Sequence, residues 1–487
     1  MRAMKRIALA LISVAVVAHA DPQAPPKDVA TRLAGRAIGT TPLAADLAEL
    51  TDGIGGRPTG SPALDKAVDW GTVKFKAIGI DVKTEAYTVP NLWLGGTAEG
   101  ECVAPAQFPL TLVAAPFSAS GTLEAPVVDV GNGTAKDFTR VGTKAKGAII
   151  IVGIGEMHTI DDLFAEYLRS DALFAAAKKA GVVAVLLESS HPRGLLYRHP
   201  VTMGDAVVPI PVAIVSREQT ERLRRLTAPR VKLAIVNTIG GAYQAKNVVA
   251  EIRGRDKPDE IVVLGAHLDA WDLGTGANDN GVNAALVIDV ARGMHELGFV
   301  PRRTIRFVLF TGEEQGMWGS AGYVQSHKAE LDKHVAMVVF DVGSGRTTGF
   351  FLDGRAELDG ALTETLAPVA GLGPFTNPID GIDGTDNFDF LISGVPNFCA
   401  NQDATPYLPD YHASSDTFDK VDIREARANV AIASAVTWGL AERAARPGKR
   451  QTRAEVMKLL AATKLDEQMK AFGQWLPFVN NRRGVSN

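Results

Sequence analysis

Residues 262–292 read VVLGAHLDAWDLGTGANDNGVNAALVIDVAR. The first part is apolar and typical of a buried strand, and the last part repeats apolar residues at helical spacing. Between the two lie one histidine and several acids, namely His267, Asp269, Asp272 and Asp279. Buried charge is costly unless it is paired or coordinates a metal. We therefore interpret the end of this strand as part of a metal site whose other ligands come from elsewhere in the chain.

The composition is that of a globular protein with more than one domain. The chain has 487 residues, of which 46% are hydrophobic and 22% charged, and its formal net charge is -4. Such a charge, without long basic runs, is not typical of a nucleic-acid-binding protein. No apolar run after the N-terminus approaches the length of a membrane span. Neither nucleic acid nor a membrane is expected as a partner.

The N-terminus has the three-part pattern of a secretory signal peptide over residues 1–20. A basic stretch, MRAMKR, precedes the apolar IALALISVAVVA, and small residues follow in AHA. An uncleaved membrane anchor is the less favoured alternative, because the apolar run is too short to span a bilayer. The pattern predicts a periplasmic or secreted protein.

Two cysteines, Cys102 and Cys399, are too few for a disulfide framework or a zinc–thiolate cluster. In an oxidising compartment they could pair, and two separately buried thiols are the alternative. The sequence leaves both open.

From residue 240 onward the chain alternates between strand, loop and helix. Apolar runs at 260–269, 303–314 and 334–344 predict strands, and 280–297 predicts a helix. Repeated units of this kind favour an α/β fold with a mostly parallel twisted sheet and helices on both faces.

The pattern divides the chain into three parts after the signal peptide. The main domain is discontinuous and comprises residues 21–93 and 240–446. Residues 94–239, called the insert below, alternate short apolar strands with helices and predict a smaller α/β domain with its own core. Residues 447–487, the C-terminal segment, form a helical extension in which 453–472 reads as one amphipathic helix without a chemical signal.

Three predicted strands end in residues of the types that bind metals, at the sheet edge where open α/β folds place their ligands. A fourth candidate lies far downstream. The residues are His267 with Asp279, Glu313 with Glu314, Asp341, and the downstream His412. Imidazole and carboxylate groups without cysteine are the donors of hydrolytic zinc sites.

This set fits two Zn²⁺ ions better than one. If Asp279 bridges, each metal has three protein ligands, and the metals lie ~3.5–4 Å apart, as in two-metal hydrolases. The two sets are His267, Asp279 and Asp341 on one metal, and Asp279, Glu314 and His412 on the other. Glu313 is then free to take a proton from the attacking water as a general base.

Two further acids are candidates for orienting the histidine ligands. Asp269 follows His267 at the i+2 position, on the same face of a strand, and Asp416 follows His412. Taken singly, each motif has a plainer explanation as a surface pair, a solvated acidic face or a helix cap. Three other histidines, His295, His327 and His334, lie in polar surroundings and are predicted to be ordinary surface residues.

The motifs resemble those of a known family. GAHLDAWDLGTGANDNG (265–281), FTGEEQGMWGS (310–320), FDVGS (340–344) and YHASSDT (411–417) are similar to the di-zinc exopeptidases of the carboxypeptidase Q (plasma glutamate carboxypeptidase) type, within the aminopeptidase Y-like group. The GGRPTGSPAL stretch resembles the N-terminal helix-linking motif of that family. The insert, with GAIIIVG and VPIPVAIVS, looks like a protease-associated domain. The resemblance extends to about residue 447.

The resemblance implies the same ligands and the same general base, Glu313, in a di-zinc peptidase domain. It also implies that Thr385 and Asp386, together with Tyr411, border the substrate pocket. The peptide bond between Asp279 and Asn280 is expected to be cis. The insert is expected to pack beside the metals and to narrow access to short substrates.

The function that follows is a zinc exopeptidase that removes N-terminal residues from short peptides or dipeptides. Carboxypeptidase-type specificity is the nearest alternative, although it usually needs a basic group for the terminal carboxylate and none is obvious. A glutaminyl cyclase-like enzyme would keep one zinc. A non-catalytic binding protein on a peptidase scaffold would have lost ligands, and this chain keeps all six positions. Short peptides are the expected partners, and a homodimer is left open.

Overall fold

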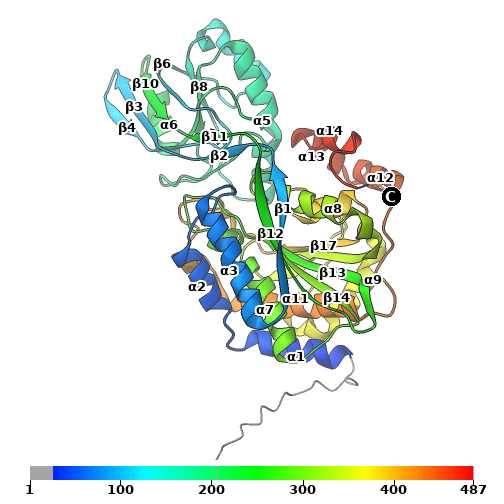
Figure 1. The fold of residues 1–487 in the computed structure, drawn as a ribbon. Helices are drawn as coiled ribbons and strands as arrows, with labels where there is room; N and C mark the ends of the chain where they lie inside the picture. Colours follow the sequence, from blue (N-terminus) through cyan, green and yellow to red (C-terminus); the bar gives the residue numbers. More distant parts are fainter. Residues whose placement is uncertain (1–25, 204–205, 486–487) are drawn as a thin grey trace, which may run out of the picture.

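The protein has two sheet-containing parts and a helical C-terminus (Figure 1). The computed structural model describes residues 26–203 and 206–485. The predicted signal peptide, residues 1–20, lies outside the described residues.

The main domain is built on a seven-stranded sheet of order β1-β12-β14-β13-β15-β17-β16. The strands are β1 (Asp81–Val89), β12 (Tyr243–Ile252), β13 (Lys257–His267), β14 (Arg303–Phe310), β15 (His334–Val339), β16 (Thr347–Phe351) and β17 (Asn397–Gln402).

The prediction of a mostly parallel sheet is wrong in its proportion. Only the three central pairs, β13–β14, β13–β15 and β15–β17, are parallel, and the three outer pairs are antiparallel. The reason is that β12, the return strand of the β1–β12 ribbon, runs antiparallel to both of its neighbours, and β16 runs antiparallel to β17. The fold is therefore mixed α/β, with parallel strands where the candidate ligands lie.

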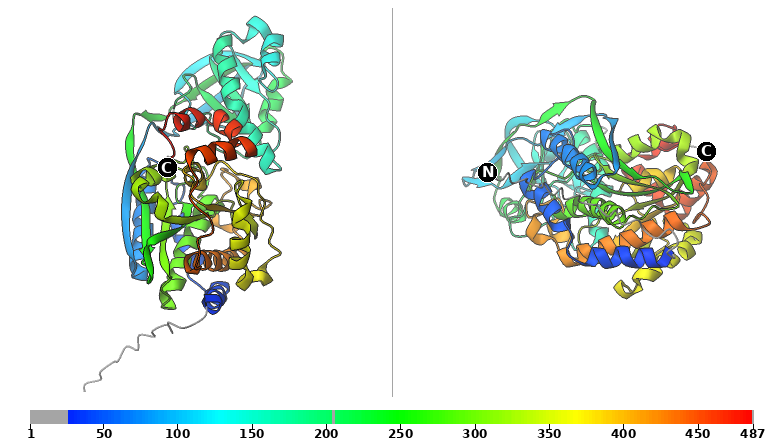
Figure 2. Two further views of the ribbon diagram at one scale, coloured as in Figure 1. Left: turned by 90° about the vertical axis from the view of Figure 1, so that its right-hand side faces the viewer. Right: turned by 60° about the horizontal axis from the view of Figure 1, so that its bottom comes forward.

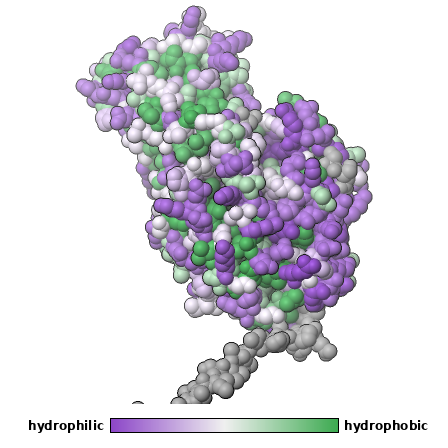
Figure 3. All heavy atoms as spheres, in the orientation of Figure 1, coloured by the Kyte–Doolittle hydropathy of each residue, from purple (hydrophilic) through white to green (hydrophobic). Residues whose placement is uncertain are grey.

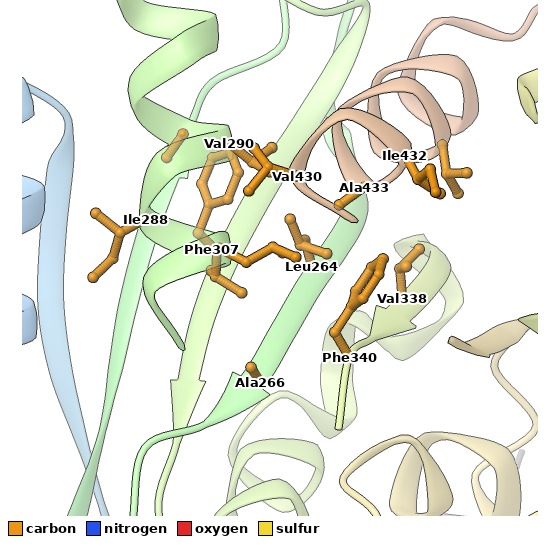
Figure 4. Packing of buried hydrophobic residues seen from close by; sticks show 14 of the residues in the cluster. Leu264, Ala266, Ile288, Val290, Phe307, Val338, Phe340, Val430, Ile432 and Ala433 are labelled. Atoms are coloured by element: carbon orange, nitrogen blue, oxygen red, sulfur yellow. The ribbon is translucent and has the colours of Figure 1, made fainter. Parts of the chain in front are cut away.

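Helices cover both faces of this sheet. Alternate residues of β13 point to opposite faces: Leu264 packs in the core beneath α7 and α11, whereas Val263 packs with residues of α8 and α10 (Figure 4). On the α7 side lie α1 (Pro26–Ile38), α2 (Leu43–Gly53), α3 (Pro62–Ile78), α7 (Val282–Glu296), α9 (Asp359–Leu366) and α11 (Ile423–Glu442). On the opposite side lie α8 (Trp318–Ser326) and α10 (Asn387–Ile392).

The insert replaces the turn of the β1–β12 ribbon. The last pair of that ribbon joins Val89 to Tyr243, and beyond it β2 (Leu92–Leu94) pairs with β11 (Thr238–Gly240) in a short two-stranded connection to the insert. The remaining strands form an eight-stranded sheet around a separate apolar core. They are β3 (Ala98–Ala104), β4 (Phe108–Leu110), β5 (Leu112–Ala114), β6 (Gly121–Asp129), β7 (Ile149–Val152), β8 (Ala184–Glu188), β9 (Val212–Val215) and β10 (Arg230–Ile235).

Three helices accompany the insert's sheet: α4 (Ala135–Val141), α5 (Ile160–Ala180) and α6 (Arg217–Arg224). The core of the insert also takes in two residues of the main domain, Trp271 and Ala413. Both lie close in sequence to candidate ligands, so the insert is packed against the predicted metal site. That it is a protease-associated domain stays a prediction.

The C-terminal segment forms three short helices, α12 (Arg453–Thr463), α13 (Leu465–Ala471) and α14 (Trp475–Val479). The prediction of one helix over 453–472 is wrong, because Lys464 takes a left-handed conformation with φ +61° and ends α12. The break lets Leu460 and Leu465 enter the same apolar cluster. The helices lie between the insert and the main domain (Figure 2, left).

Neither cysteine is paired. Cys102 and Cys399 are both free and buried, one in β3 of the insert and the other in β17 of the main domain. Of the alternatives that the sequence leaves open, the structure has two separate buried thiols.

His334 is not the surface residue that the sequence predicts. It begins β15, is 1% exposed, and lies between the hydroxyl of Tyr323 and the carbonyl of Glu330, at 3.0 Å from each. His327 is half-buried between Glu85 and Glu330, and only His295 is exposed. Glu330, a polar neighbour of both residues in the sequence, is a partner of the imidazoles of His327 and His334.

Among the residues that the structure describes, no helix is long and apolar enough to cross a membrane. On the face seen in Figure 3, hydrophobic residues form small groups among hydrophilic ones.

Candidate metal centre

The structure brings all six predicted residues together at one edge of the main sheet. His267 ends β13, the pair Glu313–Glu314 follows β14, and Asp341 follows β15. Asp279 precedes α7, and its peptide bond to Asn280 is cis, as the resemblance implies. His412 lies in the loop before α11. Parallel strands end at one edge, which explains why residues so far apart in sequence meet here.

The side chains form two groups that share Asp279. In the first, Nε2 of His267 lies 2.8 Å from Oδ1 of Asp341 and 3.3 Å from Oδ1 of Asp279. In the second, Nε2 of His412 lies 2.8 Å from Oε2 of Glu314 and 3.2 Å from Oδ2 of Asp279. Each oxygen of Asp279 thus faces a different histidine, which is the arrangement expected of a bridging carboxylate.

Glu313 is adjacent to Glu314 in sequence but differs from it in position. Glu314 is 7% exposed and holds His412, whereas Glu313 is partly exposed and its Oε2 comes only to 3.9 Å from His267. The donor atoms of Glu313 still lie within 4.8 Å of those of His267 and Asp341, so Glu313 borders the first group. Its greater exposure suits a residue that exchanges protons with water.

The donor set fits divalent metal ions. Four carboxylates, those of Asp279, Glu313, Glu314 and Asp341, face only two imidazoles, so the cluster carries excess negative charge in a largely buried place. Oε1 of Glu314 is buried without a hydrogen-bond partner. Histidine and carboxylate donors in sets of three are typical of hydrolytic zinc sites.

The pKa values of residues in the cluster are strongly shifted. Burial favours neutral imidazoles, but the nearby carboxylates outweigh it and raise the pKa of His267 well above its ordinary value and that of His412 to about 10. Burial, together with Asp341 and Glu314, raises the pKa of Glu313 well above its ordinary value. The protein thus concentrates a negative potential that bound cations would relieve.

Asp269 contacts His267, but not in the way that the sequence predicts. Nδ1 of His267 donates to the backbone carbonyl of Asp269 at 3.0 Å, while the carboxylate lies 3.6 Å away. That carboxylate instead accepts from the Thr59 hydroxyl at 2.7 Å and from the Glu313 backbone N–H at 3.4 Å. Asp269 therefore positions both a ligand and the loop that carries the general-base candidate.

The prediction that Asp416 orients His412 is wrong. The Asp416 carboxylate accepts from the backbone N–H groups of Asn278, at 2.7 Å, and Asp279, at 3.1 Å. It therefore fixes the loop of the bridging ligand. Nδ1 of His412 instead contacts the backbone carbonyl of Arg198, at 2.9 Å, which belongs to the insert.

Three residues at the centre were missed by sequence reasoning. Arg57 is fully buried and donates to the carbonyls of Leu268, Thr275 and Gly276, which brace the loop between β13 and α7. Thr59 holds Asp269. The Tyr407 hydroxyl donates to Oδ2 of Asp279 at 3.0 Å. The polar residues within the Gly- and Pro-rich GGRPTG turn were the available signal for the first two, and Tyr407 had none.

A pocket of roughly 750 Å³, open to solvent, lies over the cluster. Thr385 and Tyr411 line it as the resemblance implies, and the Tyr411 ring stacks on His412. Asp386 does not line it: the residue is fully buried and lies behind the wall. The other lining residues come from the insert, the main domain and the C-terminal segment: Ile160, Leu163, Phe164, Tyr167, Met203, Val342, Ile382, Asp383, Gly384, Tyr407 and Phe472.

Comparison with known protein families matches residues 247–437 to Peptidase family M28. All six clustered residues fall within this range. The chain thus contains a peptidase family M28 domain. The enzyme is a metallopeptidase, and matches to curated relatives cover most of the chain. It is 28% identical over 401 residues to carboxypeptidase Q of Rattus norvegicus, a match that spans 81% of this chain and 84% of the relative. It is 27% identical over 395 residues to aminopeptidase YwaD of Bacillus subtilis, spanning 77% and 79%.

Solved structures agree with the fold. The M28 peptidase precursor from Shewanella amazonensis superposes with a TM-score of 0.79 at 27% identity, over 88% of this chain and 99% of that one. A zinc aminopeptidase from Bacillus subtilis has a TM-score of 0.66 at 21% identity, over 84% and 96%. The mixed α/β architecture of this chain is therefore that of these solved structures.

Proposed function

We propose that this M28 peptidase is a two-zinc exopeptidase that removes N-terminal residues from short peptides or dipeptides. The observation that carries the proposal is the position of Asp279, whose two carboxylate oxygens face two different histidine–carboxylate pairs. A carboxylate shared in this way suits two metals held side by side.

Each residue of the cluster has a separate task. His267, Asp279 and Asp341 would hold one zinc, and Asp279, Glu314 and His412 the other. Bound zinc supplies a Lewis acid that polarises the scissile carbonyl and makes water a better nucleophile at neutral pH. Glu313, through Oε2, takes the proton from the attacking water and delivers it to the leaving amine.

The charge of the pocket favours substrates with a free amino end. Three of the acids in its described lining, Asp279, Glu314 and Asp341, would be neutralised by the two zinc ions, which leaves Glu313 and Asp383. These two carboxylates attract a terminal ammonium, and the described lining has neither lysine nor arginine to pair with a terminal carboxylate. This argues against carboxypeptidase-type specificity. The insert walls one side of the pocket, which favours short peptides.

We also place the enzyme in the periplasm or outside the cell, since residues 1–20 have the pattern of a signal peptide.

Blocked peptides test the proposal. The purified enzyme, stripped with a chelator and reloaded with zinc, is assayed on three forms of one dipeptide: free, N-acetylated and C-amidated. We expect the free and amidated forms to be cleaved, the acetylated form to resist, and activity to rise until two zinc ions are bound per chain. Cleavage of the acetylated form with loss of the amidated one would indicate a carboxypeptidase. Full activity at one zinc, with cyclisation of N-terminal glutamine, would indicate a cyclase.

A further inference from the structure

The C-terminal segment reaches into the substrate pocket, although it lies outside the M28 match. Phe472, directly after α13, is 5% exposed and lines the pocket over the metal cluster. Its ring lies 6.4 Å from that of Phe164 and 5.7 Å, edge to face, from that of Tyr167. Both partners belong to α5 of the insert. Phe472 therefore closes the pocket where the insert and the C-terminal segment meet.

Phe472 also separates two cavities. A second cavity of roughly 630 Å³ is lined among the described residues by Ser170, Thr202 and Gly473, which do not line the first. Of the described side chains, only those of Tyr167, Met203 and Phe472 line both. These three side chains are thus the wall between the metal pocket and the space beyond it. Tyr167 is held in place, since its hydroxyl lies 2.9 Å from that of Tyr411.

The C-terminal segment, which carries Phe472, is held in place by contacts with the main domain. Arg483 donates two hydrogen bonds of 2.9 Å to the buried carboxylate of Asp389 in α10. Leu465, at the start of α13, packs so closely on the loop before α10 that a β-carbon at Gly381 would lie 2.6 Å from its side chain. The segment is therefore fixed to the main domain on both sides of Phe472.

From this placement we infer that Phe472 determines the depth of the subsite for the substrate's first side chain. The inference rests on the proposed exopeptidase function and adds its selectivity: an apolar side chain of moderate size in the N-terminal residue. Away from the metal cluster, the lining of the metal pocket is largely apolar and includes Ile160, Leu163, Phe164, Ile382 and Phe472. Such a surface binds an apolar group by excluding water, and its depth limits the length of that group.

Substitution at Phe472 tests the inference on the zinc-loaded full chain. Phe472→Ala joins the two cavities, so kcat/KM for a leucyl substrate should fall by about tenfold, while that for a 2-naphthylalanyl substrate is kept or rises. Phe472→Trp makes the wall thicker and should shift the ratio of the two substrates the opposite way. The control is Leu476→Ala on α14, since Leu476 is 64% exposed and lines neither cavity.

A second series varies the other residue of the dipeptide, and binding of leucine and naphthylalanine hydroxamates is measured by calorimetry. Unchanged ratios in both Phe472 variants, at wild-type zinc content and thermal stability, would overturn the inference. A shift confined to the second residue would overturn it too. If Phe472→Ala does not fold, the Phe472→Trp ratio decides. A wild-type enzyme that cleaves none of the peptides would refute the proposed function instead, and the hydroxamate affinities would still report on the wall.

Discussion

The backbone carbonyl of Arg198 in the insert lies 2.9 Å from Nδ1 of His412, and the N–H of Arg198 donates to the carbonyl of His412 at 3.0 Å. A carbonyl oxygen only accepts, so Nδ1 of His412 keeps its proton, and Nε2, which faces Asp279 and Glu314, is the nitrogen that would bind zinc. The insert thus sets the tautomer of a proposed zinc ligand. Its role extends beyond narrowing the entrance.

The Arg198 side chain holds this connection, so its loss should weaken zinc binding. It is 3% exposed and donates to both oxygens of Asp272, at 2.8 and 2.9 Å. We expect Arg198→Met to lower zinc affinity by about 10- to 100-fold and stability by about 1–3 kcal/mol. Metal titration and thermal unfolding measure both. Arg230→Met, which removes the exposed pair with Glu124 on the same domain, is the control and should change neither. Equal zinc affinity in the two variants would refute the coupling.

Substitutions of the neighbours Glu313 and Glu314 should impair the enzyme in different ways. Glu313→Gln removes a base but no proposed ligand, so two zinc ions should stay bound while kcat falls by a factor on the order of 10²–10⁴. Glu314→Gln removes the carboxylate at 2.8 Å from His412, so one zinc should be lost and excess zinc should partly restore the rate. Metal analysis with steady-state kinetics distinguishes them. Loss of zinc from the Glu313 variant alone would reverse the roles.

Asp416 should matter for metal affinity through the loop of Asp279. In Asp416→Asn, an NH₂ group must face one of the two backbone N–H groups that the carboxylate now accepts from, those of Asn278 and Asp279. We expect zinc affinity to fall by about 10- to 100-fold, measured by competition with a chelator. Asp419→Asn, at an exposed position three residues on, is the control. If both variants bind zinc like the wild type, Asp416 does not position the bridge.

Stability should fall below neutral pH because of His334. Burial lowers the pKa of His334 to about 4, whereas the unfolded chain titrates near 6.5, so the unfolded state binds the extra proton between these values. The buried neutral imidazole of His334 therefore costs no stability above pH 6.5. As the pH falls from 6.5 toward 4, the free energy of unfolding decreases, by about 2 kcal/mol at pH 5. The nearby charges of Arg306, His327 and Glu330 act on the same imidazole.

The comparison of variants isolates this effect. His334→Gln keeps a donor for the Glu330 carbonyl and an acceptor for the Tyr323 hydroxyl but does not titrate. Denaturant unfolding at pH 7.5 and pH 5 should show a smaller loss for His334→Gln than for the wild type, and His295→Gln, at an exposed position, should behave like the wild type. The same pH loss in all three proteins would contradict the assignment.

Local sequence patterns were enough to predict the three strands that carry ligands and the residues of the metal cluster. His267, Glu313–Glu314 and Asp341 each follow an apolar run, and such runs report strands through local periodicity alone. Because parallel strands end at one edge, the convergence of these residues follows from the order of strands and loops. Asp279 and His412 were predicted from residue type, because they complete two sets of three ligands, and the resemblance to a family implies the same assignment.

The groups that hold these ligands in place became visible in the folded structure alone. The partner of His412 is a backbone carbonyl 214 residues away in another domain, and Asp416 binds backbone N–H groups rather than the nearby imidazole. Backbone donors and acceptors are the same at every position, so no residue type marks them in a sequence. Phe472 was hidden for a related reason. An aromatic residue in an amphipathic helix reads as core, and whether it faces a core or a pocket depends on where the break at Lys464 and the contact of α13 with α5 direct the chain.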